Sequence, residues 1–402
     1  MEKNKKAKNY KKASAAVLVA LFCYLLFSYG YILGKQGVDI GIGPSGVSNY
    51  RDQNNVDFSL FWEAWDKLKD KSMAASDPKE MLYGSISGLL SSTKDPYTTF
   101  LTPNDNKRFR EDIQGEFSGI GVELTVKNGL PTVVAPISGY PAEEAGLKAN
   151  DVILEVDGTK TSEIGFNDII DKIRGEVGTK VKLKVISGDS EDPREISIER
   201  KNIVIKSVEW SYEKNSDNKT IVIVKVRQFG DDTENLFDEM ANDVIRKSPD
   251  GMIIDLRNNP GGYLETAVSL ASYFVEDGLV LSEKGKNDKT KEYKASGHTK
   301  LKNFSPAILI NEGSASASEI FAGALRDRLD SKLIGKKSFG KGSVQELIDL
   351  SDGSAVKITV AKWYTPSGQQ INGEGINPDV DVEEKEETSQ DEQLDEAKQS
   401  FK

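Results

Sequence analysis

The stretch NEGSASASEI (residues 311–320) is followed further along the chain by a second stretch, SFGKGSVQ (residues 338–345). The apolar run AILI (residues 307–310) precedes the first stretch and predicts a short buried strand. Apolar residues recur at helical spacing in residues 319–329. The sequence therefore predicts a strand, a turn and a helix, with three serines at the start of the helix. The second stretch places a lysine between two glycines, at the start of another strand.

A serine acts as a nucleophile when a neighbouring base takes its proton. His298 is the only histidine in the chain, and it lies in a polar, lysine-rich stretch that predicts a surface loop. A serine–histidine–aspartate triad is therefore disfavoured, and Lys341 is the remaining candidate base. An ordinary lysine, with a pKa near 10.4, is protonated at neutral pH. The site must therefore bury Lys341 and lower its pKa toward about 7, and the flanking Gly340 and Gly342 permit the tight turn that this requires.

Five further segments accompany these two stretches. They are DPYTTFL (residues 95–101), GEFSGIGVEL (115–124), PAEEAGLKANDVILEVDG (141–158), DLRNNPGG (255–262) and GINPDV (375–380). The order of these segments resembles that in the C-terminal processing peptidases, which are also called tail-specific proteases. The resemblance extends from about residue 57 to residue 382. Members of that family use a serine–lysine dyad. The resemblance implies an α/β catalytic core of the ClpP and crotonase-like type, with a PDZ domain inserted before it.

Three serines of the first stretch, Ser314, Ser316 and Ser318, compete for the role of nucleophile. The resemblance assigns this role to the middle one, Ser316, and the role of general base to Lys341. It also places Gln345 in the same site. If a strand begins near Lys341, its two-residue period puts Lys341 and Gln345 on one face, so Gln345 could hold the neutral amine by hydrogen bonding.

The start of the predicted helix gathers free backbone N–H groups and the positive end of the helix dipole. The amide of Ala317 could therefore stabilise the oxyanion that forms when Ser316 attacks a peptide carbonyl. The segment DLRNNPGG predicts a second strand, turn and helix. By the resemblance, either Gly261 or Gly262 of this turn offers the second oxyanion donor.

The composition excludes several classes of function. The chain has 402 residues, of which 37% are hydrophobic and 29% charged, and this composition is ordinary for a globular protein of two or three domains. A net charge of -11 argues against a nucleic-acid partner, because phosphates require a basic surface. One cysteine, Cys23, and one histidine cannot form a disulfide or a Cys/His metal cluster. No metal and no cofactor are expected.

The N-terminal segment predicts a membrane anchor. Residues 1–12 contain six lysines, and residues 13–33 contain no charge. At about 1.5 Å per helical residue, the uncharged run covers the hydrocarbon core of about 30 Å. The lysine excess keeps the N-terminus in the cytoplasm, which places the rest of the chain on the extracytoplasmic side of a cell membrane. A signal peptide cleaved after Gly30 is the alternative.

Residues 113–205 resemble a PDZ domain. The glycine loop formed by Gly119, Ile120, Gly121 and Val122 would present backbone N–H groups to the C-terminal carboxylate of a peptide, which would extend the following strand. Residues 166–173 would form the helix beside the peptide groove. Arg174, at the end of this helix, resembles a position that links peptide occupancy to the active site, and a surface cation at a helix end is the alternative reading.

The remaining boundaries follow from composition. Residues 34–56 predict a linker, residues 57–112 a helical segment, residues 206–382 the peptidase core and residues 383–402 a disordered acidic tail. In the resembled family such a helical segment helps to pair subunits, so Trp62 or Trp65 could contribute to a homodimer contact.

The sequence thus predicts a membrane-anchored serine endopeptidase that cleaves protein or peptide substrates near their C-termini. Two other functions could use the same residues. One is a membrane-tethered PDZ binding module with an inert peptidase core, and the other is a crotonase-like acyl-CoA enzyme.

Overall fold

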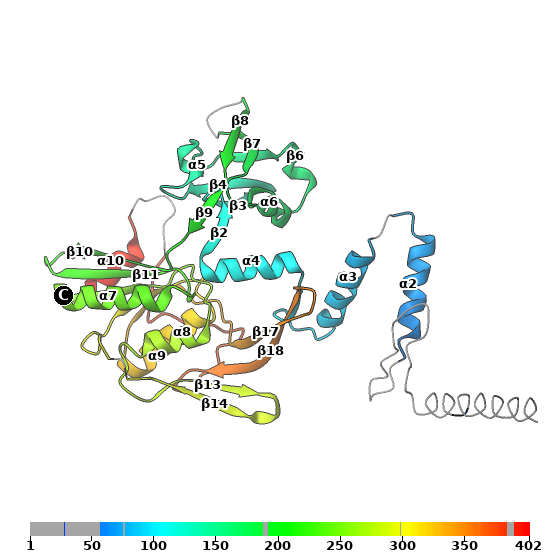
Figure 1. Ribbon diagram of the computed structural model, residues 1–402. Coiled ribbons are helices and arrows are strands. Elements are labelled where there is room, and N and C mark those ends of the chain that lie inside the picture. Colours follow the sequence, from blue (N-terminus) through cyan, green and yellow to red (C-terminus); the bar gives the residue numbers. More distant parts are fainter. Residues whose placement is uncertain (1–27, 29–56, 75–76, 188–191, 298, 384–389) are drawn as a thin grey trace, which may run out of the picture. The chain divides into compact units, whose positions relative to one another are not determined.

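The computed structural model describes residues 28, 57–74, 77–187, 192–297, 299–383 and 390–402 (Figure 1). Apart from Ser28, the expected membrane anchor and linker lie outside these residues, as does His298. Across the parts of the chain that the structure describes, every helix is too short or too polar to cross a lipid bilayer. The chain divides into two compact units, residues 1–81 and 82–402.

The smaller unit contains the helix α2 (Ser59–Lys71). Its aromatic side chains gather on one side, where the Phe61 and Trp62 rings lie 5.0 Å apart and the Trp62 and Trp65 rings 6.1 Å apart. None of the residues in α2 is buried. The next helix, α3 (Pro78–Ser91), crosses the boundary between the units along the chain.

The centre of the larger unit is a six-stranded sheet in the order β10-β11-β12-β15-β16-β19. β10 runs antiparallel to β11, and the other neighbours are parallel. The carboxyl ends of the parallel strands meet at one edge, so the loops that follow β12 and β15 lie together there. The strands are β10 (Val208–Lys214), β11 (Thr220–Val226), β12 (Gly251–Asp255), β15 (Ala307–Ile310), β16 (Leu333–Gly335) and β19 (Val380–Asp381).

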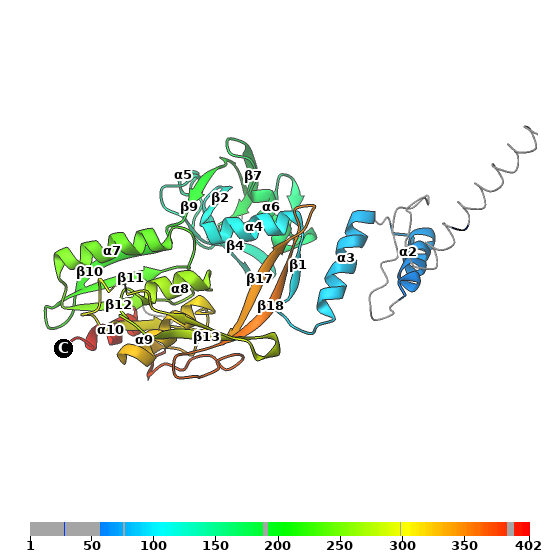
Figure 2. The ribbon, with the colours of Figure 1, turned by 60° about the horizontal axis from the view of Figure 1, so that its bottom comes forward.

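Both faces of this sheet are covered. Successive strand residues point to opposite faces. Val222, Met252 and Ile308 therefore join one core with helices α7, α8 and α9, while Ile221, Ile253 and Leu309 join another with α10. Figures 1 and 2 show α7 and α10 on opposite sides of the sheet. The helices are α7 (Thr233–Lys247), α8 (Leu264–Ala271), α9 (Ala317–Leu329) and α10 (Glu392–Gln399).

A second sheet has the order β1-β18-β13-β14, with β17 paired to β18. β17 and β18 form an antiparallel hairpin, and the chain enters β17 directly after Lys341 and Gly342. The elements are β1 (Thr99–Leu101), α4 (Pro103–Gln114), β13 (Leu279–Gly285), the short 3-10 helix η2 (Lys286–Asp288), β14 (Thr290–Lys294), β17 (Ser343–Asp349) and β18 (Ala355–Tyr364).

A third, antiparallel sheet forms the PDZ-like part of the larger unit, in the order β3-β4-β5-β7-β8 with β6 on β5. β2 pairs with β9, so the chain enters and leaves this part side by side. The elements are β2 (Glu116–Gly119), β3 (Val122–Lys127), β4 (Leu130–Pro136), α5 (Pro141–Glu144), β5 (Val152–Val156), β6 (Thr159–Lys160), η1 (Thr161–Glu163), α6 (Phe166–Ile173), β7 (Lys180–Ile186), β8 (Arg194–Glu199) and β9 (Lys201–Val204).

The predicted disordered tail is wrong for residues 390–402. These residues contain α10, whose Asp391 side chain caps the helix by accepting a hydrogen bond from the Leu394 amide. Leu394, Ala397 and Phe401 pack against the central sheet. Their spacing of three and four residues forms a narrow apolar stripe that the acidic composition of the segment conceals.

Candidate active site

Residues 311–316, here called the nucleophile loop because they carry the predicted nucleophile, join β15 to α9 as the sequence predicts. Ser316 is the N-cap of α9, with φ 56° and ψ -115°. A positive φ is uncommon for a residue with a side chain, and such strain persists only where the surroundings enforce it. Here Glu319 contributes, because its Oε2 atom accepts a hydrogen bond of 2.9 Å from the Ser316 amide. The Ser316 hydroxyl makes no cap hydrogen bond.

The other two serines of this stretch have structural roles. Ser314 and Ser318 are fully buried. The Ser314 hydroxyl donates to the Leu256 carbonyl at 2.8 Å, and the Ser318 hydroxyl donates to the Asn259 carbonyl at 2.9 Å. Ser316, in contrast, is only half-buried. Of the three serines, Ser316 is therefore the one that can meet a substrate.

Lys341 is held in the tight turn that its neighbouring glycines permit. Gly340 has φ 90°, and a Cβ atom added there would lie 2.7 Å from the Gly375 amide nitrogen. The Lys341 backbone is fixed by a hydrogen bond of 3.0 Å from Trp363 Nε1 to the Lys341 carbonyl. The Nζ atom lies 5.5 Å from the centre of the Tyr97 ring. Tyr97 belongs to the DPYTTFL segment, so this segment reaches the site.

The surroundings of Lys341 favour its neutral form. Burial lowers the pKa of Lys341, the nearby Lys357 lowers it further, and Glu319 raises it. Lys357 is also half-buried, and this partial burial lowers its own pKa. Lys357 lowers the pKa of Lys341 because the two lysines line the same cavity. Lys357 lies in a strand with no motif around it, so the sequence alone gives no sign of this effect.

A cavity of about 470 Å³ brings the predicted site residues together. Ser316, Lys341 and Gln345 line it, together with Gly262 and Lys357. Its apolar lining residues suit the binding of a peptide side chain. They include Leu264, Ile320, Val344 and Trp363.

The expected hydrogen bond between Gln345 and Lys341 is not present among the described residues. Gln345 Nε2 instead donates to Ser343 Oγ at 2.8 Å and to Thr359 Oγ1 at 3.3 Å. The strand starts at Ser343, after Lys341, and its register shifts between Val344 and Gln345. Lys341 therefore lies outside the strand, and the prediction that its side chain shares a strand face with Gln345 is wrong.

The two glycines of the DLRNNPGG segment differ in their amides. The Gly261 amide donates to Asn259 Oδ1 at 2.9 Å, so it is already used. The Phe229 amide donates to the Gly261 carbonyl, and the Phe229 carbonyl accepts from the Tyr263 amide. These two hydrogen bonds lie on either side of Gly262. Within the described residues, the Gly262 amide has no acceptor, and Gly262 lines the cavity whereas Gly261 does not.

The Ala317 amide is also without an acceptor among the described residues, as the first amide of a helix usually is. Gly262 and Ala317 are therefore the two amides available to an oxyanion. The close approach of their loops depends on Gly261, where an added Cβ atom would lie 2.8 Å from Ser316 Cβ.

Glu319 is a site residue that the sequence analysis missed. Its carboxylate is buried and joins the first stretch, to which it belongs, to the SFGKGSVQ stretch. One oxygen accepts from the Ser316 and Lys341 amides, both at 2.9 Å. The other accepts from Ser338 Oγ at 2.6 Å and the Gly340 amide at 2.7 Å. Burial raises the pKa of Glu319, against these four hydrogen bonds, which lower it. The capping-box pattern S-x-x-E of residues 316–319 could have revealed it.

Glu319→Gln should therefore lower both stability and activity. Four donors meet the carboxylate, so an amide NH2 group would face at least one of them and leave a buried polar group unsatisfied, at about 2 kcal/mol. Urea unfolding and peptide cleavage would measure the two effects. Glu312→Gln, an exposed glutamate in the same loop, is the matched control. Equal stability and activity in the two variants would contradict the bridging role of Glu319.

The predicted peptide-binding residues of the PDZ-like part also come together. Gly119, Ile120, Gly121 and Val122 line a cavity of about 120 Å³ with α6 and Arg174. Gly121 has φ 73°, and a Cβ atom added there would lie 2.4 Å from Tyr140 Cβ. The loop therefore requires glycine at this position.

Arg174 is not a solvated cation at a helix end. Its guanidinium pairs with Asp112 at 2.8 Å and Glu111 at 3.5 Å, both in α4, and lies 4.4 Å from the centre of the Phe117 ring. Only 20% of its side chain is exposed. Arg174 thus lines the cavity of about 120 Å³ on one side and contacts α4 on the other, and α4 contributes Phe109 and Arg110 to the cavity at Ser316.

Comparisons with known proteins agree with this geometry. Residues 220–382 match peptidase family S41, and residues 132–187 match the PDZ domain. A probable CtpA-like serine protease of Staphylococcus haemolyticus is 34% identical over 383 residues, which cover 93% of this chain and 75% of the relative. Its counterpart in a bovine strain of Staphylococcus aureus is 39% identical over 381 residues, covering 94% and 73%.

Among solved structures, the photosystem II D1 C-terminal processing protease is similar to this chain. The two share 30% sequence identity and superpose with a TM-score of 0.54. The match covers 81% of this chain and 87% of that protein.

Proposed function

This chain belongs to peptidase family S41, with the CtpA-like C-terminal processing proteases, and from this premise we propose that it cleaves proteins near their C-termini through a Ser316–Lys341 dyad. The observation that carries the proposal is the single cavity that Ser316 and Lys341 line together. The lowered pKa of Lys341 supports its role as a base.

The proposed reaction follows from the positions of these groups. Neutral Lys341 takes the proton from Ser316 Oγ, which attacks the scissile carbonyl. The amides of Gly262 and Ala317 stabilise the oxyanion of the tetrahedral intermediate. The C–N bond then breaks, and the leaving amine receives the proton from Lys341. Water hydrolyses the acyl-enzyme, with Lys341 again accepting a proton and returning it to Ser316.

Labelling with a fluorophosphonate distinguishes this enzyme from a PDZ binding module with an inert core. The reagent should modify the wild-type protein at Ser316, as located by peptide mass spectrometry, and leave Ser316→Ala unmodified. Absence of label in a folded wild-type protein that also fails to cleave peptides would favour the binding module.

The PDZ domain is proposed to recognise the free C-terminal carboxylate of the substrate. The loop at Ile120 and Gly121 lies beside the peptide cavity, and backbone N–H groups in such loops bind carboxylates. A peptide with an amidated C-terminus should therefore be cleaved more slowly than the same peptide with a free one. The measurement is kcat/KM for the matched pair, and equal values would remove carboxylate recognition without affecting the dyad.

Membrane anchoring rests on the sequence of residues 13–33. We propose a single-pass anchor that places the peptidase on the extracytoplasmic side. Protease added to intact cells should digest the peptidase core while the cytoplasmic N-terminus survives. Release of the full chain by alkaline carbonate would contradict the anchor.

A homodimer is proposed through the smaller unit. The exposed apolar residues of α2 support it, since Leu60 is 73% and Leu68 49% exposed on the helix that also carries Trp62 and Trp65. Light scattering should show a dimer that Trp62→Ala or Trp65→Ala weakens. A monomeric wild-type protein would contradict it.

A further inference from the structure

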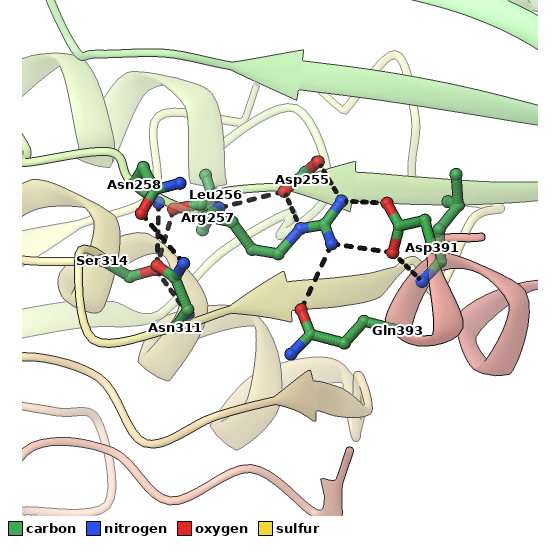
Figure 3. Close-up of polar contacts among 9 residues, drawn as sticks. Asp255, Leu256, Arg257, Asn258, Asn311, Ser314, Asp391 and Gln393 are labelled. Atoms are coloured by element: carbon green, nitrogen blue, oxygen red, sulfur yellow. Dashed lines mark hydrogen bonds and ion pairs between the residues drawn. The ribbon is translucent and has the colours of Figure 1, made fainter. Parts of the chain in front are cut away.

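Arg257, the residue that opens the loop of the DLRNNPGG segment, is shared between two carboxylates (Figure 3). Its Nε and Nη2 atoms donate to the two oxygens of Asp255 at 2.9 and 2.8 Å. Its Nη1 and Nη2 atoms donate to the two oxygens of Asp391 at 2.9 and 2.8 Å. Only 12% of the Arg257 side chain is exposed. Paired bidentate contacts of this kind fix both the position and the plane of a guanidinium group.

Asp391 brings the C-terminal helix α10 to this arginine. The same carboxylate caps α10 through the Leu394 amide at 2.9 Å. Gln393 adds a second contact, since its Oε1 accepts from Arg257 Nη1 at 3.2 Å while its Nε2 donates to the Val382 carbonyl. Gln393 is 1% exposed. The N-terminal end of α10 is therefore held by hydrogen bonds to Arg257.

From Arg257 the contacts continue into the nucleophile loop. The Asn258 amide donates to Asn311 Oδ1 at 2.8 Å, and Asn311 Nδ2 donates back to Asn258 Oδ1 at 3.0 Å. The Leu256 carbonyl accepts from Ser314 Oγ. Figure 3 shows these contacts on one side, and the contacts of the Arg257 guanidinium on the other.

The next residue, Asn259, completes the connection to the catalytic groups. It is fully buried, and its side chain accepts from the Gly261 amide. Its carbonyl accepts from the Ala315 amide at 3.0 Å and from Ser318 Oγ at 2.9 Å. Residues 256–262, here called the oxyanion loop, are thus hydrogen-bonded on both sides of Ser316.

We propose that Arg257, clamped by Asp391 of α10, is a positioning residue that holds the oxyanion loop, and with it the Gly262 amide, in register with Ser316. Asp255 alone could neutralise the charge of Arg257. The second carboxylate comes from the far end of the chain and fixes the free side of the guanidinium, so the C-terminal helix becomes part of the catalytic framework. This inference rests on the proposed function.

Asp391→Asn tests it with little disturbance of α10, because asparagine caps helices as well as aspartate does. An oxyanion donor contributes about 10²–10³ in kcat, so partial misplacement of Gly262 should lower kcat by about tenfold with KM unchanged. The affinity of a peptide aldehyde, whose adduct with Ser316 places an oxyanion at the same amides, should fall by the same factor. Arg257→Lys should behave likewise, since one ammonium cannot hold two carboxylates bidentately.

Lys398→Gln is the matched control, because it removes a salt bridge of the same helix, that of Lys398 with Glu213 at 2.8 Å, and leaves both partners of the Arg257–Asp391 pair in place. It should leave kcat and aldehyde affinity unchanged. All assays should be run below the melting temperature of each variant, so that loss of folded protein does not lower the measured kcat. Unchanged kcat in folded Asp391→Asn and Arg257→Lys, or an equal loss in Lys398→Gln, would overturn the inference. Cleavage that survives Ser316→Ala would instead refute the dyad.

Discussion

Ser316→Ala is expected to reduce kcat for peptide cleavage by roughly a millionfold, the scale on which a serine peptidase loses activity with its nucleophile. Among the three serines of the stretch, Ser316 is the one that lines the cavity with Lys341. Its strained backbone is costly to maintain in a helix start that serves only packing. Substrate affinity should change little, because the rest of the cavity is intact.

Ser314→Ala and Ser318→Ala are the controls. Each removes a buried hydroxyl that donates to a backbone carbonyl, which should cost about 1 kcal/mol of stability. Neither hydroxyl reaches the cavity, so activity should stay within about tenfold of the wild type. If Ser314 or Ser318 proved indispensable while Ser316→Ala retained cleavage, the assignment of the nucleophile would be wrong.

The elements that carry the site were predictable because their signals are local. Four consecutive apolar residues define β15, and the predicted strand coincides with Ala307–Ile310. The strand and helix around DLRNNPGG appear as β12 and α8. A fully buried strand such as β15 shows a continuous apolar run, and a helix that buries one face shows apolar residues at helical spacing.

What sequence reasoning could not supply is set by contacts between distant residues. The choice between Gly261 and Gly262 depends on which amide Asn259 occupies. The role of Glu319 depends on four donors that converge from two loops. The C-terminal segment forms the helix α10 in contact with Arg257, which is far away along the chain. No periodicity encodes such partners, although the capping box at Ser316 was a usable signal for Glu319.

Lys341→Met is expected to abolish cleavage, because the thioether keeps the length of the side chain but cannot take a proton from Ser316. In the wild-type protein, the rate should rise with pH as Lys341 loses its proton, over a range below its ordinary pKa of 10.5, since burial lowers that pKa. Lys357→Met should shift this rise to higher pH, because it removes the neighbouring charge that lowers the pKa of Lys341.

Lys341→Met should leave the protein as stable as the wild type, or more stable, at pH 7. A lowered pKa in the folded state means that the unfolded chain binds more protons than the folded one, between the folded pKa of Lys341 and its ordinary value near 10.5. Wild-type stability therefore rises with pH through this window. Methionine binds no proton, so the advantage of Lys341→Met should shrink as the pH approaches 10.

Thermal melts of both proteins from pH 7 to pH 10 would measure this difference. Lys341 could swing into water and become protonated, so the melts should be repeated with a covalent Ser316 inhibitor that closes the site. Lys337→Met, an exposed lysine of the same loop, is the control and should show no such pH-dependent gain. A markedly less stable Lys341→Met in the inhibited state would identify Lys341 as a structural cation. Stability gained together with activity lost, with a gain that shrinks toward pH 10, is the result expected of a base whose neutral form the fold favours.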